Sequence, residues 1–74
     1  MSYDAATEKF LKKLGTRLRE IRLEKGWTLE QTEEHGWPSW KHLQKIESGK
    51  NINVSTLYKL SQVYKVPLNK LMDF

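Results

Sequence analysis

The sequence has 74 residues and no cysteine, so the chain cannot form disulfides or thiolate zinc sites. Histidine is also scarce, because His35 and His42 are the only two. Two imidazoles without supporting cysteines do not indicate a metal site. We therefore expect no metal and no cofactor, and a small core that is stabilised by closely packed helices or by a second subunit.

No apolar run approaches the ~18 residues that a membrane-spanning helix needs. The first residues also lack the charged, apolar and small-residue order of a signal peptide. We therefore expect a soluble, cytoplasmic protein with no membrane partner. The chain has about half the ~150 residues of a typical domain, which predicts one domain, residues 1–74.

The sequence has none of the residue combinations that indicate catalysis. It contains no nucleophile–base pair, no carboxylate pair in an apolar segment and no glycine-rich phosphate loop. A chain of this size also leaves little room for a cleft. We therefore expect a protein that is not an enzyme and that has no evident small-molecule ligand.

Positive charge is in excess and is unevenly distributed. Thirteen Lys and Arg residues against nine Asp and Glu give a net charge of +4. Residues 38–70 hold six lysines and one glutamate, whereas residues 27–37 hold three glutamates and no lysine or arginine. A basic surface favours polyanionic partners, although net charge alone does not identify one.

Apolar residues recur at three- and four-residue steps early in the chain, at Leu11, Leu14, Leu18 and Ile21. This spacing predicts a helix that starts near residue 4 and ends at Gly26. Residues 1–13 would be an N-terminal extension of this first helix.

Two short helices are predicted next. Thr28 is a suitable N-cap for a second helix at residues 28–36, because Glu30 and Gln31 follow it in the first turn, close to a capping box. Ser39 can cap a third helix at residues 39–48.

The spacing of apolar residues also predicts the rest of the chain. The third helix would bury Leu43 and Ile46 and end at Gly49 in a left-handed conformation. Asn53 would cap a fourth helix, which has one apolar face and ends before Pro67. A last short apolar turn would follow. No alternation of period two indicates strands.

The second and third predicted helices are joined by only about three residues around Trp37 and Pro38. A connection this short makes two helices cross steeply, which is the helix-turn-helix geometry. Such a pair cannot bury its own core, so flanking helices must cover it. The sequence therefore predicts an all-α fold with five helices.

Five stretches of the chain resemble the DNA-binding domain of the phage-repressor and Cro family: 14–22, 24–28, 43–50, 54–57 and 66–68. The helix-turn-helix part runs from residue 27 to residue 50 without a gap. The resemblance implies a compact five-helix fold like that of the lambda repressor. It also implies a small transcriptional regulator that binds double-stranded DNA at specific sequences and is associated with the nucleoid when it is bound to DNA.

The resemblance places the third helix, residues 39–48, in the major groove. Trp40, Lys41 and Lys45 would face the bases, because positions one turn apart line one face of a helix. Trp40 could instead pack inward on the second helix. Backbone amides near Thr28 and Asn53 would hold phosphates. The expected DNA-binding residues are Thr28, Ser39, Trp40, Lys41, His42, Gln44, Lys45, Lys50, Asn51 and Asn53.

The resemblance also implies an ion pair between Arg22 and Glu47, and a homodimer that binds a palindromic operator. One recognition helix reads only a few base pairs, so a two-fold pair is needed for operator affinity. Leu68 and Leu71 could instead close the monomer core. The expected dimer interface residues are Leu68, Leu71, Met72 and Phe74.

Three residues depart from the family pattern: Leu29 stands where the family has Gln, Glu33 where it has Ala, and Trp37 where it has Gly. Glu33 would face the third helix, where its carboxylate needs a hydrogen bond or a cation, or must turn to water. These departures suggest an alternative function, a protein-interaction module. It would bind its partner through Trp37, Trp40 and the carboxylates of the second helix.

Overall fold

The computed structural model describes residues 4–74, and within them the chain forms helices and no strands. This confirms the predicted all-α fold with five helices. None of the helices is both long and apolar enough to cross a membrane within this range. The elements are α1 (Ala5–Glu24), the 3-10 helix η1 (Glu30–His35), α2 (Trp40–Glu47), α3 (Val54–Tyr64) and α4 (Leu68–Leu71).

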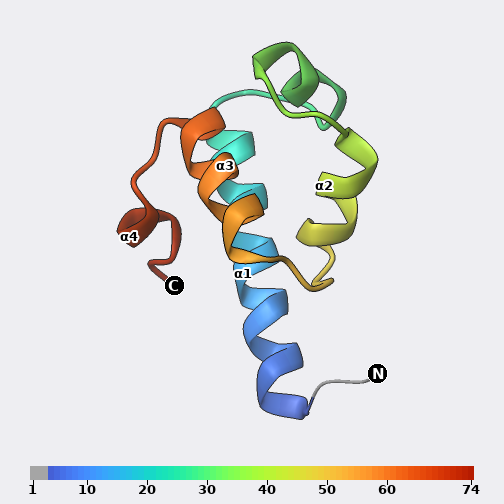
Figure 1. Ribbon diagram of the computed structural model, residues 1–74, viewed down its shortest axis with the longest axis vertical. Helices are drawn as coiled ribbons and strands as arrows, with labels where there is room; N and C mark the ends of the chain where they lie inside the picture. Colours follow the sequence, from blue (N-terminus) through green and yellow to red (C-terminus); the bar gives the residue numbers. More distant parts are fainter. Residues whose placement is uncertain (1–3) are drawn as a thin grey trace.

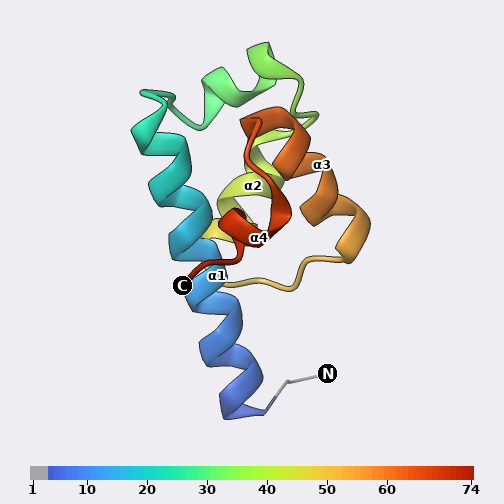
Figure 2. The ribbon, with the colours of Figure 1, turned by 90° about the vertical axis from the view of Figure 1, so that its left-hand side faces the viewer.

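The other helices gather around the C-terminal part of α1. Both views show the N-terminal part of α1 projecting beyond the rest of the molecule (Figures 1 and 2). The helix α2 and the short α4 both contact α1, and η1 contacts α2. This arrangement leaves one long side of α2 uncovered (Figure 1).

The helix α1 begins and ends where the sequence predicts. The Asp4 carboxylate accepts a hydrogen bond of 2.7 Å from the Thr7 amide, and this bond lowers the pKa of Asp4. After Glu24 the chain turns at Gly26, whose φ of 78° lies in the left-handed region. The predicted apolar stripe of α1 is buried: Leu11, Leu14, Leu18 and Ile21.

The second predicted helix, 28–36, is wrong in type and length, because the chain forms the 3-10 helix η1 at Glu30–His35. The expected capping box is present: the Thr28 hydroxyl accepts from the Gln31 amide, and the Gln31 side chain accepts from the Thr28 amide at 2.8 Å. Gly36, with a φ of 103°, ends the segment. So few residues between two fixed ends favour the tighter 3-10 geometry.

The predicted caps of the next two helices are confirmed. The Ser39 hydroxyl accepts from the His42 amide at 3.3 Å, and Asn53 Oδ1 accepts from the Thr56 amide at 2.8 Å. The helix α2 is followed by Gly49, with a φ of 104°. The helix α3 ends at Lys65, which adopts a left-handed φ of 55° without being glycine.

The core lies between α1, α2 and α3. Leu18, Leu43, Leu60 and Tyr64 are completely buried in it. Burial raises the pKa of the Tyr64 phenol. Trp27 is only partly buried and packs against this core. The buried apolar residues are Leu11, Leu14, Leu18, Ile21, Trp37, Leu43, Ile46, Leu60, Tyr64 and Leu71.

Gly15 of α1 lies directly against the backbone of the last turn of α2. A Cβ atom placed there would lie 2.6 Å from the Ile46 carbonyl oxygen and 2.5 Å from the Glu47 carbonyl oxygen. Both atoms belong to the backbone, which cannot rotate away as a flexible side chain could. The absence of a side chain at Gly15 therefore lets the last turn of α2 rest directly on α1.

The C-terminal segment is tied to α1. Arg17 Nη2 donates to the Lys70 carbonyl at 2.9 Å, and the rings of Phe10 and Phe74 lie 5.5 Å apart. Leu71 is completely buried in the monomer. Leu71 is therefore a core residue that a second chain cannot reach, which corrects its expected place in a dimer interface.

Candidate nucleic-acid interface

The helix α2 has one buried and one open face. Leu43 and Ile46 point into the core, as predicted. The opposite face carries Lys41, Gln44 and Lys45, which are all exposed. Hydrogen-bond donors therefore stand one turn apart along an accessible helix, which is the arrangement that reads base edges in a major groove.

Two aromatic residues flank this face. Trp40, in the first turn of α2, is half-buried, and its ring centroid lies 5.9 Å from Lys41 Nζ. His42 is exposed, and its ring lies 5.9 Å from that of Trp37. Both residues therefore lie in the first turn of α2, beside its open face.

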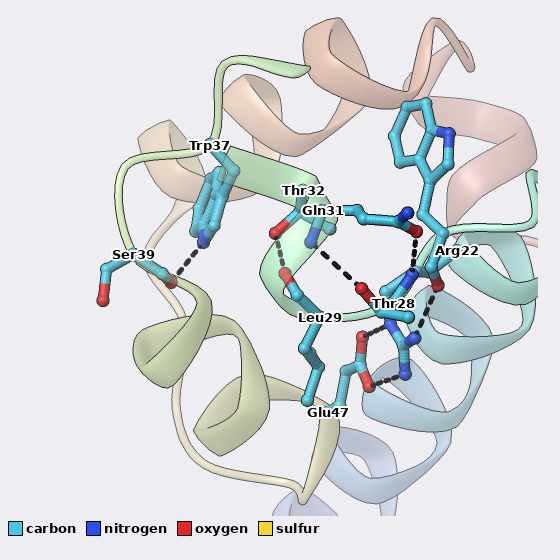
Figure 3. A network of polar contacts seen from close by, with 9 residues as sticks. Arg22, Thr28, Leu29, Gln31, Thr32, Trp37, Ser39 and Glu47 are labelled. Atoms are coloured by element: carbon cyan, nitrogen blue, oxygen red, sulfur yellow. Dashed lines mark hydrogen bonds and ion pairs between the residues drawn. The ribbon is translucent and has the colours of Figure 1, made fainter. Parts of the chain in front are cut away.

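Trp37 has a different role from the one considered for it. Its side chain is only 2% exposed, and its Nε1 donates to the Ser39 carbonyl at 2.7 Å (Figure 3). The indole fills the turn between η1 and α2 and fixes the start of α2. Trp37 is not available to a protein partner, which corrects the role proposed for it in the interaction-module alternative.

Glu33 finds the hydrogen bond that its position requires. Glu33 Oε2 accepts from the Trp40 backbone amide at 2.8 Å. Trp40 is the first residue of α2, so its amide has no partner within the helix. The departure from alanine therefore links η1 directly to the N-terminus of α2.

The opposite end of α2 is held by a buried ion pair (Figure 3). Arg22 Nε lies 2.8 Å from Glu47 Oε2, and Arg22 Nη2 lies 3.0 Å from Glu47 Oε1. Arg22 Nη1 also donates to the Trp27 carbonyl at 2.8 Å. The hydrogen bonds with Glu47 raise the pKa of Arg22, although its burial opposes this shift. This network connects α1 to the end of α2.

The expected phosphate-binding positions surround the open face of α2. Lys50, Asn51 and Asn53 lie exposed in the connection between α2 and α3. The Thr28 amide is already bound by the Gln31 side chain, so it cannot also donate to a phosphate. The Asn53 side chain is likewise engaged as the cap of α3.

Sequence reasoning missed Arg19. This exposed residue of α1 shares a shallow groove with Leu29 and Gln44, next to the ion pair of Arg22 and Glu47. Arg19 lies three residues before Arg22, about one turn away on the same helix. Because the sequence already predicts that Arg22 contacts the helix of Glu47, a residue one turn before Arg22 is also expected to lie beside that helix.

The histidines do not form a metal site. His35 is stacked on Trp27, with ring centroids 3.8 Å apart and an interplanar angle of 8°. Within residues 4–74, no group of three or more His, Cys, Asp or Glu side chains could hold a metal ion.

Comparison with known proteins identifies the family. A family model described as a helix-turn-helix domain matches residues 15–73, which is most of the chain. The chain belongs to this helix-turn-helix family. The match confirms the resemblance drawn from the sequence, and it covers both helices of the motif, η1 and α2. No curated protein and no solved structure matches the chain closely enough to count as a relative.

Proposed function

We propose that this helix-turn-helix protein is a transcriptional regulator that binds specific sequences of double-stranded DNA as a homodimer. The observation that carries the proposal is the open face of α2, where Lys41, Gln44 and Lys45 stand exposed on a helix that is anchored at both ends. A rigid helix with donors at helical spacing suits base recognition in the major groove.

Each side chain of this face has a partner among the base edges. A lysine can donate to O6 and N7 of guanine, and a glutamine can pair with N6 and N7 of adenine. The half-buried ring of Trp40 can contact the methyl group of thymine. In this proposal Lys41, Gln44 and Lys45 supply the hydrogen bonds that distinguish one sequence from another.

Residues around α2 would set its register on the DNA. Phosphate contacts fix orientation without reading sequence, and exposed cations and amides supply them. Lys50 and Asn51 are exposed beyond the end of α2, and Arg19 is exposed on α1 beside it. The side chains of Ser39 and His42, at the start of α2, complete the set of proposed DNA contacts.

The homodimer is proposed because one recognition helix covers only a few base pairs. Leu68 and Met72 are half-buried and Phe74 is 46% exposed, so apolar atoms of the C-terminal segment remain uncovered in the monomer. We assign Leu68, Met72 and Phe74 to the dimer contact. The operator would then contain two half-sites related by two-fold symmetry.

The protein-interaction alternative is less well supported. It relies on Trp37, Trp40 and the carboxylates of η1, but Trp37 is buried and Glu33 is bound to the backbone of α2. Two of its contact groups therefore already serve the fold.

Alanine at Lys41 and Lys45 tests the reading face. We expect the double variant to lose about 1–3 kcal/mol per base contact on a selected DNA site, because hydrogen bonds to bases disappear. The loss on random DNA should be smaller. Measuring Kd on both DNAs by fluorescence anisotropy checks this expectation.

The matched control is alanine at Lys9 and Lys13, which are exposed on α1 with the same four-residue spacing. This pair removes the same charge away from α2, so it should mainly reduce the dependence of Kd on salt. Equal losses on selected and random DNA for the α2 pair would contradict a role in reading bases.

A further inference from the structure

Glu33, a residue of η1, binds the first backbone amide of the proposed recognition helix α2. The carboxylate of Glu33 accepts the Trp40 amide at 2.8 Å, and the Ser39 hydroxyl accepts the His42 amide at 3.3 Å. Two of the first three amides of α2 are therefore bound by side chains of the chain itself. In DNA-binding helices such amides are otherwise free to hold phosphate oxygens.

The charge of Glu33 is not neutralised by a neighbouring side chain. Within the described chain, the one ion pair between side chains joins Arg22 and Glu47. Glu33 is exposed, and η1 contains no lysine or arginine. The positive end of the α2 dipole favours this carboxylate, but a full negative charge still faces outward at the start of a surface proposed to meet DNA.

We propose that Glu33 is a positioning and specificity-determining residue of this helix-turn-helix protein. Its carboxylate sets the start of α2 relative to η1. It also excludes phosphate from that helix end, so that binding depends more on the side chains of α2 and less on the sugar-phosphate backbone. The inference rests on the proposed DNA binding, and it explains an acid where the family pattern has alanine.

The charge of Glu33 should change the affinity for DNA only slightly, and mainly the affinity for DNA of random sequence. A unit charge about 7 Å from a phosphate, at the dielectric constant of water, changes binding roughly three-fold. On random DNA, where the protein is held by backbone contacts alone, this repulsion acts in full. On a selected site the base contacts of α2 fix the position of the helix on the duplex, so the repulsion changes the affinity less.

The test compares Glu33→Gln with Glu34→Gln. Both variants remove one negative charge from η1, but the Glu34 side chain is exposed, and the side-chain acceptors of the Trp40 and His42 amides are Glu33 and Ser39. At low salt we expect Glu33→Gln to bind a random duplex about three-fold more tightly than Glu34→Gln does, and to discriminate less between selected and random DNA. Equal affinities of the two variants for the random duplex would overturn the specificity role.

A measurement on the free protein separates positioning from DNA binding. Glutamine can still accept the Trp40 amide, whereas alanine cannot, so amide exchange at Trp40 should stay slow in Glu33→Gln and become faster in Glu33→Ala. Unchanged exchange in Glu33→Ala would overturn the positioning role. If the wild type binds no duplex, the proposed function fails and the specificity role fails with it, while the exchange result alone then decides the positioning role.

Discussion

Replacing Arg22 with alanine should lower the free energy of unfolding by roughly 3–5 kcal/mol. The substitution leaves the Glu47 carboxylate, whose side chain is 6% exposed, without its cation. It also removes the donor to the Trp27 carbonyl. For a domain of this size ~1 kcal/mol corresponds to about 4–8 °C, so thermal unfolding should show a Tm lower by at least about 12 °C.

Two further variants test whether the loss of stability comes from the buried ion pair. Arg19→Ala removes an exposed arginine one turn away and should change the Tm by no more than about 4 °C. Arg22→Met combined with Glu47→Leu should recover part of the loss, because no buried charge remains unpaired. If Arg22→Ala melts within about two degrees of the wild type, the network of Arg22 does not stabilise the fold as argued.

Gly15→Ala should destabilise the protein by about 1–3 kcal/mol, although alanine favours a helix by up to ~1 kcal/mol over glycine. The added methyl group would lie within 2.6 Å of the carbonyl oxygens of Ile46 and Glu47, so α2 must move away from α1. Chemical denaturation measures the loss, and weaker binding to a selected DNA site should accompany it because α2 carries the proposed reading face.

Thr16→Ala is the control, since Thr16 is the exposed neighbour of Gly15 on the same helix. It should have little effect on stability. A Gly15→Ala variant as stable as the wild type would show that α2 does not rest on α1 at this point.

The helices and most of the core could be predicted from the sequence, because they follow from local rules. Leu14 and Leu18 recur at the helical period, and both are buried. Ser39 and Asn53 stand immediately before helical segments, and both cap them. Such signals lie within a few residues of the structure that they determine.

Other features depend on contacts between segments. The 3-10 form of η1 and the burial of Trp37 depend on how closely α2 follows in space. The hydrogen bond from the Trp40 amide to Glu33 crosses the turn between two helices. Gly15 could be read only as a helical glycine, since its partner on α2 lies about thirty residues further along the chain. Sequence periodicity carries no information about these pairings.

The departures from the family pattern have structural explanations. Leu29 is half-buried and packs against the core, which explains an apolar residue at this position. Glu33 caps α2, and Trp37 fills the turn and binds the Ser39 carbonyl. Two of the three substitutions therefore strengthen the connection between η1 and α2, as the proposed role of α2 in reading DNA requires of a rigidly held helix.

The central claim is that the protein binds specific duplex DNA as a two-fold dimer. The most direct measurement is selection of bound sequences from a pool of random duplexes at moderate salt, followed by the stoichiometry of the selected complex. The account predicts enrichment of two symmetric half-sites about one helical turn, ~34 Å, apart, with two chains on each duplex. A pool that shows no enrichment, or a selected site that holds a single chain, would contradict it.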